Sequence, residues 1–431
     1  MRKFIIFICF FSFAFYSVAQ LSTVIGKKYT NFSGIDYFFV FNGITNSTEI
    51  TYDGTLTPDS IVNWEKFDGT FKSNQNYFSP ENNIGYVVKV NGKIKATCWV
   101  IDYKQFLPVF TSFEWENNPN NQCQEVKLLI NANVPTIGYS TYSGIYHSIP
   151  REFNIKYQTK SWSGKDWKQI DTIQSVILPT TQKTVPAPYC NTVYTLEGDQ
   201  FATDLGITPA SITSSQYITN AVICKLTTAV TSRTRDKNNE AEAPADKLPI
   251  NYSAPIDVQF LSNANEPVAQ FYNWTISKGS ESPITRKDKD ERYTFTEAGT
   301  YKVKVTASNS ICSYSDSISV IVSTSDIKAP NVFTPNGDGF NDEFRVAYKS
   351  IISFQCWVYN RWGVLVYTWT DPTKGWDGKI NGVNAKPGPY FYVIKAKGSD
   401  YDPNSTPDSK THRRVGEHLL KGDINLLRGV Q

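Results

Sequence analysis

The sequence predicts an all-β chain of tandem β-sandwich domains. Phe, Trp and Tyr make up 14% of its 431 residues, and Thr, Ser and Val recur beside them, a composition that favours strands. Apolar and polar residues alternate in short runs that end at turn pairs such as Asn42-Gly43 and Asn91-Gly92. Almost no segment has the sustained 3.6-residue period of an amphipathic helix. A chain of this length is expected to hold three or four domains.

The first residues have the pattern of a secretory signal peptide. Two basic residues precede an apolar run from Phe4 to Val18, and Ser17-Val18-Ala19 supplies the small residues of a cleavage site. We therefore expect residues 1–19 to be removed. The run is shorter than the roughly 20 residues of a membrane-spanning helix, and an uncleaved anchor is the alternative.

The charge balance excludes some classes of partner. Removal of residues 1–19 takes away two basic residues and no acidic ones, which leaves 41 Lys and Arg against 40 Asp and Glu. A net charge of +1 argues against nucleic acid or an anionic membrane surface as the main partner.

Residues 20–105 are expected to form the first sandwich. Asp36–Phe41 is a nearly continuous apolar strand, and Trp64 ends a candidate central strand as its large core residue. Tyr86–Ile101 is the clearest hairpin, because the Asn91-Gly92 pair at its centre favours a two-residue type I′ turn.

Residues 106–230 are expected to form a second, longer β-sandwich. Its strongest predicted strands are Val126–Ile130, Phe153–Tyr157 and Ala221–Thr227. Gly198–Ser211 is predicted as either a short helix or a long loop. Residues 231–249 are mostly charged residues with Ala, Asn and Pro, which offer too little apolar surface to pack. This segment is therefore predicted as a linker or an exposed loop.

Residues 250–325 are expected to form a third module. Its landmarks are a central Trp274 and Tyr293–Val305, which is predicted as a hairpin. These features resemble the PKD (polycystic kidney disease) family of immunoglobulin-like sandwiches. Thr275–Gly279 stands where that family usually has Asp-Phe-Gly-Asp-Gly, so the resemblance implies the fold and not a ligand role of those Asp residues. The predicted fold class of the chain is thus all-β, with tandem immunoglobulin-like β-sandwich domains.

The C-terminal quarter carries five short motifs in order, each rich in Gly, Asn, Asp or Trp. The first motif contains Thr334, Pro335, Asn336, Gly337, Asp338, Gly339, Asn341 and Asp342, and the second contains Asn360, Arg361, Trp362 and Gly363. The third contains Trp376, Asp377 and Gly378, the fourth Gly388 and Tyr390, and the fifth Gly422, Leu426 and Arg428. Gly337 and Gly339 are expected to adopt positive φ in a tight loop. Trp362 and Trp376 are expected to fill the core of a small antiparallel sandwich.

These motifs resemble the gliding motility-associated C-terminal domain, the type B sorting signal of the bacterial type IX secretion system. The resemblance covers residues 329–431. It implies an address that an outer-membrane translocon and its shuttle proteins read, with export through the periplasm to the cell surface or beyond. The segment Ser399–His418 is longer than the usual closing hairpin, which leaves the pairing of the last strand least defined.

Two groups of residues are candidates for ligand binding. An oxygen-rich loop could hold Ca²⁺, although the same residue types favour plain turns; it consists of Asn336, Asp338, Asn341 and Asp342. No other cofactor is expected. Four aromatic residues form either a sugar-stacking platform or ordinary half-buried core; they are Trp99, Trp115, Trp162 and Trp167.

Catalytic patterns are missing from the sequence. It contains no G-x-S-x-G, H-E-x-x-H, C-x-x-C or P-loop pattern. Glu114 and Glu116 share one strand face, but glycosidase chemistry also needs a cleft. His412 and His418 lie in polar segments and are expected to be exposed. The leading hypothesis is a non-catalytic surface or secreted protein with an adhesive or structural binding role. A carbohydrate-binding surface protein and a hydrolase with an unrecognised site are the alternatives.

Six cysteines remain once residues 1–19 are removed, and a chain that crosses an oxidising periplasm can keep disulfides. We expect the two bridges that close the shortest loops, Cys98–Cys123 and Cys190–Cys224. A Cys98–Cys224 link is the alternative that joins the first two domains. Cys312 and Cys356 are predicted as free, buried thiols.

Overall fold

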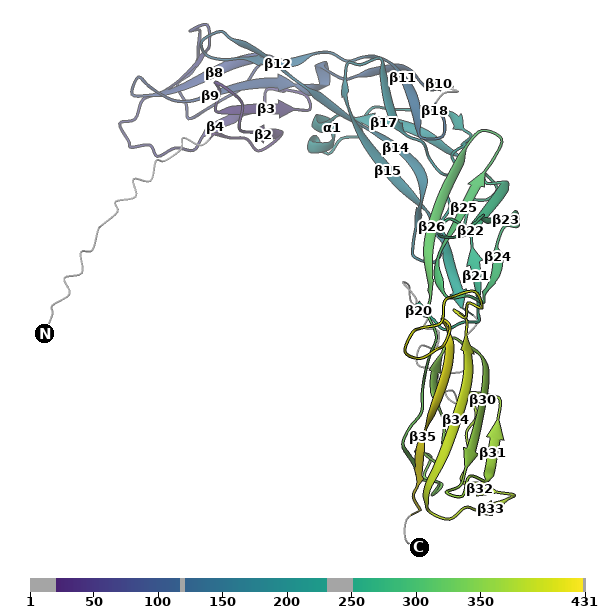
Figure 1. Ribbon diagram of the computed structural model, residues 1–431. Coiled ribbons are helices and arrows are strands. Elements are labelled where there is room, and N and C mark those ends of the chain that lie inside the picture. The colour runs from purple at the N-terminus through teal and green to yellow at the C-terminus, as the bar shows by residue number, and fades with distance from the viewer. Residues whose placement is uncertain (1–20, 117–120, 231–250, 429–431) are drawn as a thin grey trace, which may run out of the picture. The chain divides into compact units, whose positions relative to one another are not determined.

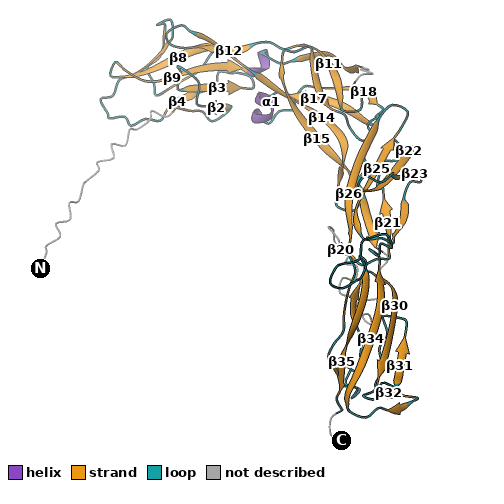
Figure 2. Cartoon of the chain, in the orientation of Figure 1, coloured by secondary structure: helices purple, strands orange, loops and turns teal. Residues whose placement is uncertain are grey.

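The computed structural model describes residues 21–116, 121–230 and 251–428. Strands dominate this part of the chain (Figure 2), and an all-β fold is confirmed. The expected signal peptide and the expected linker at 231–249 lie outside the described residues. The chain divides into two compact units: the first comprises Met1–Ser161 and Gln169–Thr219, and the second comprises Trp162–Lys168 and Asn220–Gln431.

The first unit begins with two facing sheets. The larger sheet has the order β2-β3-β9-β8-β5-β6 and the smaller one β1-β4-β7. Their strands are β1 (Leu21–Ser22), β2 (Lys27–Tyr29), β3 (Tyr37–Phe41), β4 (Ile50–Tyr52), β5 (Val62–Lys66), β6 (Phe71–Ser73), β7 (Tyr77–Phe78), β8 (Ile84–Val90) and β9 (Lys93–Asp102). Trp64 is fully buried between the sheets, 4.4 Å from the Phe78 ring centroid, as predicted. Asn91 and Gly92 both have positive φ in the β8–β9 turn, as a type I′ hairpin requires.

Strand β3 is apolar along its whole length because both of its faces are buried. Phe39 and Phe41 pack against the smaller sheet, whereas Phe38 and Val40 pack on the opposite side. That opposite side is covered by β12 (Ile137–Ser140) and the helix α1 (Gln200–Leu205). One core therefore joins residues on both sides of the boundary expected near residue 105.

The remaining strands of the first unit form a 3-stranded sheet, a 4-stranded sheet and a 2-stranded hairpin. The sheet orders are β10-β11-β16 and β15-β14-β17-β18, and β12 pairs with β13. These strands are β10 (Val109–Glu116), β11 (Glu125–Asn133), β13 (Tyr146–Ile149), β14 (Arg151–Trp162), β15 (Trp167–Leu178), β16 (Gln182–Pro186), β17 (Thr192–Gly198) and β18 (Ser211–Tyr217), and a short 3₁₀ helix, η1, covers Tyr103–Gln105. The predicted strands Val126–Ile130 and Phe153–Tyr157 lie within β11 and β14. α1 resolves the helix-or-loop alternative, since Asp199 caps its first turn and Gly206, with a φ of 65°, ends it.

The third predicted strand of this region, Ala221–Thr227, is wrong. Its residues belong to the second unit and have irregular backbone, and β19 begins only at Thr227. The segment is held by the Asn265 side chain, which accepts from Ile223 N (2.9 Å) and donates to Ala221 O (2.9 Å). The apolar alternation therefore reflects burial against the next domain and not a sheet ladder.

The first half of the second unit is a two-sheet sandwich. The sheet orders are β19-β21-β24 and β20-β26-β25-β22-β23. The strands are β19 (Thr227–Val230), β20 (Asn251–Tyr252), β21 (Ile256–Leu261), β22 (Phe271–Lys278), β23 (Ile284–Arg286), β24 (Glu291–Phe295), β25 (Gly299–Ser308) and β26 (Ser313–Val322). The predicted Tyr293–Val305 hairpin is wrong, because β24 and β25 belong to different sheets. Phe295 and Tyr301 meet in a T-shaped contact with 4.8 Å between centroids, so the connection crosses from one sheet to the other.

Trp274 is the core anchor of this sandwich, as predicted. It is fully buried and its indole N–H donates to Asp288 O at 2.9 Å. Replacing it with Ala should lower the free energy of unfolding by roughly 3–5 kcal/mol, through lost burial and the cavity left behind. Hydrogen exchange in β22 and β25, measured in the full chain, should rise accordingly. The matched control is Phe271→Ala, an exposed ring on the same strand; equal exchange in both variants would contradict the assignment.

The C-terminal part of the second unit is a further sandwich (Figure 1). Its main sheet has the order β28-β35-β34-β30-β31, and the pairs β27-β29 and β32-β33 complete it. The strands are β27 (Asp326–Lys328), β28 (Val332–Phe333), β29 (Ala347–Lys349), β30 (Ile351–Tyr359), β31 (Leu365–Trp369), β32 (Lys379–Ile380), β33 (Val383–Asn384), β34 (Gly388–Gly398) and β35 (Glu417–Leu426). β35 pairs with β34 from Gly388↔Leu426 to Lys397↔Glu417, so the long preceding connection leaves the last strand fully paired.

The predicted disulfides are wrong. Cys98, Cys190 and Cys224 are free thiols, so neither Cys98–Cys123 nor Cys190–Cys224 forms. Cys123 and Cys312 are the disulfide-bonded residues, which also corrects the expectation for Cys312; a free, buried Cys356 is confirmed. Loop length was a poor guide because it ignores side-chain direction: on β9 the pleat turns Cys98 into the core between Ala96 and Val100.

Thiol labelling should reproduce this pattern. In the native chain iodoacetamide should modify Cys190 first, because it is half-buried whereas Cys98, Cys224 and Cys356 are buried. Burial raises the pKa of all four thiols, that of Cys224 to about 11. After unfolding without reductant, all four free thiols should react. Peptide mass mapping measures this, and labelling of Cys123 or Cys312 before reduction would show that the bond assignment is incorrect.

Candidate functional site

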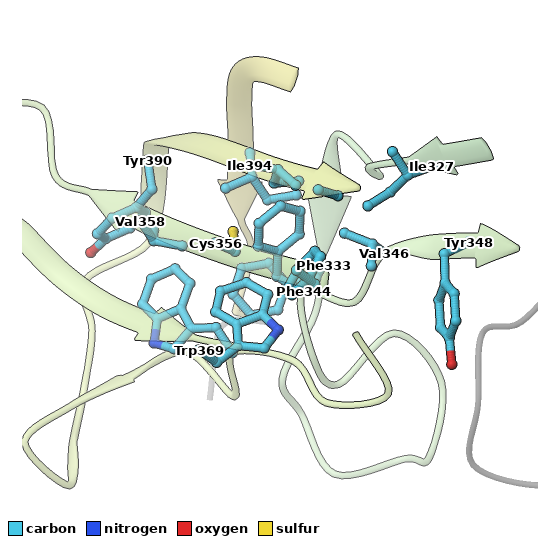
Figure 3. Close-up of a cluster of buried hydrophobic side chains, with 14 of the residues drawn as sticks. Ile327, Phe333, Phe344, Val346, Tyr348, Cys356, Val358, Trp369, Tyr390 and Ile394 are labelled. Atoms are coloured by element: carbon cyan, nitrogen blue, oxygen red, sulfur yellow. The ribbon is translucent and has the colours of Figure 1, made fainter. Parts of the chain in front are cut away.

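The C-terminal sandwich has a hydrophobic core of its own. Figure 3 shows its side chains converging from β28, β30, β31 and β34, and every member of the buried cluster lies between Ile327 and Leu426. Trp376 is fully buried at its centre, with ring centroids 4.9 Å from Tyr390 and 5.4 Å from Phe333. The prediction that Trp376 fills the core is confirmed.

The backbone around Trp376 is fixed by hydrogen bonds on both sides. Trp376 and Phe344 exchange two backbone bonds of 2.8 and 3.1 Å, and the indole N–H donates to Lys379 O at 2.7 Å. Asp377 accepts from Lys379 N (3.0 Å) and so closes the turn that begins β32. The Tyr390 hydroxyl donates to Lys386 O at 2.9 Å, just before β34.

Arg428 ties the ends of the domain together. Its guanidinium donates to Pro335 O (3.2 Å) and to Gly378 O (2.9 Å). Gly378 has a φ of 73°, and a Cβ there would lie 3.0 Å from Pro335 and 3.1 Å from Arg428 and Leu426. The first, third and fifth motifs thus meet at one point, which explains a Gly and an Arg in these places. On β35, a Cβ at Gly422 would lie 2.6 Å from the Tyr392 hydroxyl.

The loop of the first motif is organised by Asp342. Its carboxylate accepts from Asn336 N (3.0 Å), Gly337 N (2.6 Å) and Gly339 N (2.8 Å), while Thr334 N donates to Asn341 O (2.8 Å). Gly337 and Gly339 have φ values of 82° and 87°, as predicted.

These bonds bear on the calcium alternative. Phe340 N and the Asn336 amide both donate to Asp338, and these bonds hold the pKa of that carboxyl below its usual range. The carboxylate oxygens therefore close the loop on itself, which is the turn role. In the parts of the chain that are described, no group of three or more His, Cys, Asp or Glu is placed to hold a metal ion.

Trp362 corrects the prediction for the second motif. Its side chain is 77% exposed, and so the expectation that it fills the core is wrong. Asn360 builds the turn after β30 by accepting from Trp362 N (2.9 Å) and Val364 N (3.1 Å), and Gly363 follows with a φ of 76°. The turn takes Trp362 out of the strand alternation. The position of Trp362 immediately before a turn glycine is the sequence feature that could have indicated its exposure.

A shallow groove of about 430 Å³ lies beside Trp362. It runs between this turn and the β32–β33 hairpin, where Val383 is also exposed. Arg361 and Lys386 are the charged residues of its lining, and the Arg361 guanidinium lies 5.1 Å from the Trp362 ring centroid. The groove therefore combines exposed apolar surface with positive charge.

The predicted sugar-stacking residues are half-buried and belong to separate aromatic contacts. Trp99 packs near Phe67 and Trp115 near Tyr217, with centroid distances of 6.1 and 5.3 Å. In the second unit, Trp162 and Trp167 contact each other edge to face at 5.2 Å, and the Trp167 indole N–H donates to Asn263 O. The structure does not bring these side chains into one continuous stacking surface within either unit.

The remaining polar candidates have local roles. Glu114 accepts from Ser215 N (3.1 Å) and its hydroxyl (2.6 Å), and Glu116 pairs with Lys127 at 2.6 Å. His412 is exposed, as expected. His418 is half-buried, which is a correction: its Nε2 lies 2.6 Å from Ser325 Oγ, because β35 carries it into the sheet. Burial lowers the pKa of His418.

Two family models match parts of the chain. Residues 116–214 match the fibronectin type III domain, and residues 327–406 match the CHU_C type IX secretion signal domain. The second match covers most of the domain built around Trp376 and ends before β35 and Arg428. A comparison with functionally curated proteins found no match. The type IX secretion signal implies an interaction with that secretion machinery and export to the cell surface or the extracellular space.

Solved structures that resemble the chain are arrays of β-sandwiches. Three N-terminal domains of the bacteriophage RB49 highly immunogenic outer capsid protein (Hoc) are 12% identical, covering 74% of this chain and 98% of that chain, with a TM-score of 0.20. Sidekick-1 immunoglobulin domains 1–5 are 11% identical, covering 95% and 81%, with a TM-score of 0.22. Chicken CNTN1 FN1–FN3 domains are 10% identical, covering 69% and 98%, with a TM-score of 0.17. These similarities concern the fold and carry no functional argument.

Within residues 21–116, 121–230 and 251–428, none of the helices has the length and apolar character needed to cross a bilayer.

Proposed function

We propose that this is a non-catalytic, multidomain surface or secreted protein that the type IX system exports, with adhesive or structural binding domains upstream of a sorting domain at 329–431. The observation that carries the proposal is the CHU_C match at 327–406 on a domain with a core of its own. A domain that folds around its own core can be recognised whatever cargo precedes it.

The resemblance to the gliding motility-associated, type B sorting family supports the finer assignment. All five motifs are present, and the first, third and fifth converge on Arg428. For the third module, a PKD-like assignment is supported by the buried Trp274 and by a two-sheet sandwich around it. Neither feature provides catalytic chemistry, which supports a binding role for the cargo.

The second motif supplies the surface on which we expect the translocon or a shuttle protein to dock. Trp362 and Val383 are both exposed and line the same groove, and exposed apolar surface of this kind marks interaction sites. Trp and Arg are the residue types most often found as energetic centres of protein interfaces. With Arg361 and Lys386 in the groove lining and no acidic residue among them, the fitting partner presents an acidic segment beside an apolar one.

A fusion experiment tests whether the domain is sufficient for export. A fluorescent reporter placed between a signal peptide and residues 327–431 should reach the cell surface in a host with the type IX system. Protease treatment of intact cells and blotting of the medium measure this. The control carries the Gly378→Val change, which the close contact with Pro335 does not allow. A reporter that stays in the periplasm with the unaltered domain would refute the proposed sorting role.

A further inference from the structure

A pocket in the first unit lies among aromatic side chains. It has a volume of about 250 Å³ and is bounded by the end of β5, the start of β8, Trp99 on β9 and the turn after β12. Three rings line it: Phe67, Trp99 and Tyr142. The Phe67 centroid lies 6.1 Å from that of Trp99 and 5.3 Å from that of Tyr142. All of these elements belong to the same compact unit.

Gly85 provides the tight contact beneath two of these rings. A Cβ at this position would lie 2.3 Å from a Phe67 ring carbon and 2.7 Å from a Trp99 ring carbon. The rings therefore rest directly on the β8 backbone. Phe67 is also anchored by its backbone N–H, which donates to Gly85 O at 2.9 Å. The pocket is thus formed before any ligand arrives.

Polar groups without partners surround this aromatic pocket. The Asn83 amide and the Tyr142 hydroxyl line the pocket, and neither makes a side-chain hydrogen bond to the described part of the chain. Both groups can donate and accept, so a ligand with hydroxyl groups would supply their partners.

The charges of the rim limit the ligand class. Lys66 is paired with Glu81 at 2.8 Å, and the exposed Asp68 carboxylate near the opening accepts one hydrogen bond from Thr70 N at 2.8 Å. Its remaining acceptor capacity suits hydroxyl groups, and its charge disfavours an anionic ligand. Flat aromatic faces favour a ligand with a flat C–H surface, whereas Asn, Asp and Tyr favour one with several hydroxyl groups.

From these features we propose that the pocket binds one neutral sugar ring, stacked on Trp99, Phe67 or Tyr142, with its oxygen atoms facing Asn83 and Asp68. The inference rests on the binding role proposed for the upstream domains and names their ligand class. An aromatic side chain of a protein partner would fill the same volume. It would offer few hydrogen-bonding groups to the Asn83 amide and the Asp68 carboxylate, which makes the sugar the better match.

Saturation-transfer NMR on the purified full chain tests the proposal directly. The probes are the methyl glycosides of glucose, galactose, mannose and N-acetylglucosamine, with N-acetyl-tyrosine amide as the aromatic competitor. Trp99→Ala and Tyr142→Ala each remove one ring of the pocket, and Tyr142 is 42% exposed, so its replacement should leave the fold intact. Each change should weaken binding about tenfold, the equivalent of one aromatic or hydrogen-bonded contact. Phe71→Ala, an exposed ring on β6 outside the pocket, should bind like the unaltered chain.

The outcomes separate the pocket from the export route, because the binding measurement needs no secretion machinery. Transfer to at least one glycoside, reduced in both pocket variants and unchanged in Phe71→Ala, supports the proposal. Transfer to none of the four glycosides, transfer to the tyrosine amide alone, or equal binding by all variants would overturn it. A failure of the reporter fusion would leave this result intact.

Discussion

Removal of residues 329–431 is expected to leave the remaining chain in the periplasm, with none of it accessible to protease on intact cells. A signal peptide addresses only the first membrane, and the type IX signal match lies wholly beyond residue 326. Residues upstream of it have cores formed without the C-terminal domain, so the truncated chain should stay folded. Surface labelling and fractionation measure the result. Surface exposure of the truncated chain would refute the sorting assignment.

Two Trp variants distinguish whether export requires only that the C-terminal domain is folded or also requires the surface around Trp362. Trp376→Ala should cost roughly 3–5 kcal/mol of unfolding free energy and stop export because the domain unfolds. Trp362→Ala should leave the unfolding midpoint unchanged, since the side chain is exposed, and yet reduce export. The matched control is Ile352→Ala, an exposed apolar residue on β30 away from the groove. Export of Trp362→Ala at the level of Ile352→Ala would rule out this docking surface.

The second large effect is expected for Asp199, which lies in a buried ion pair of the first unit. The Arg151 and Asp199 side chains are 2% and 0% exposed, and Arg151 Nε lies 2.5 Å from the carboxylate. Asp199 also accepts from the Tyr103 hydroxyl (2.8 Å) and caps α1 through Ala202 N (3.2 Å). Asp199→Ala leaves a buried, unpaired guanidinium, at a cost of about 3–5 kcal/mol, and loss of the cap adds about 1 kcal/mol.

The destabilisation caused by Asp199→Ala should extend to neighbouring segments, because Arg151 also donates to Phe106 O and Pro135 O, both at 2.8 Å. Chemical unfolding of the full chain measures the change, and hydrogen exchange should rise in α1 and β12 together. Glu197→Ala is the control: its pair with Lys156 lies on the same sheet but is solvent-accessible, so the loss should stay below about 1 kcal/mol. Similar losses of unfolding free energy in Asp199→Ala and Glu197→Ala would show that burial does not determine how much an ion pair contributes.

Local sequence patterns predicted where the strands lie better than which strands pair with one another. Trp64 and Trp274 could be assigned to cores because each lies in an alternating apolar run, and alternation fixes which side chains share a face. Tyr293–Val305 has the same alternation, but whether two strands pair or cross between sheets is decided by contacts distant in sequence. The Phe295–Tyr301 contact carries that information, and it is visible only in the fold.

In the candidate site, too, local features could be predicted from the sequence and contacts between distant residues could not. Glycines with positive φ and the self-closing Asp342 loop follow from turn chemistry and could be predicted. The clasp of Arg428 on Pro335 and Gly378 joins residues far apart in the chain, and no local signal indicates it. The pocket beside Trp99 is a similar case, because Tyr142 reaches it from the segment that was assigned to the next domain.

The position of β35 has a consequence for the timing of export. This last strand lies between β28 and β34, and it supplies the buried Ile424 and Leu426. A nascent or prematurely terminated chain that stops before Glu417 lacks the strand that joins β28 to β34 in the main sheet, and it lacks the Arg428 clasp. If the domain is the sorting signal proposed above, we expect it to become recognisable only after synthesis has passed residue 428. Shorter fragments of the cargo would then be retained, and only chains translated to this point would be offered to the secretion machinery.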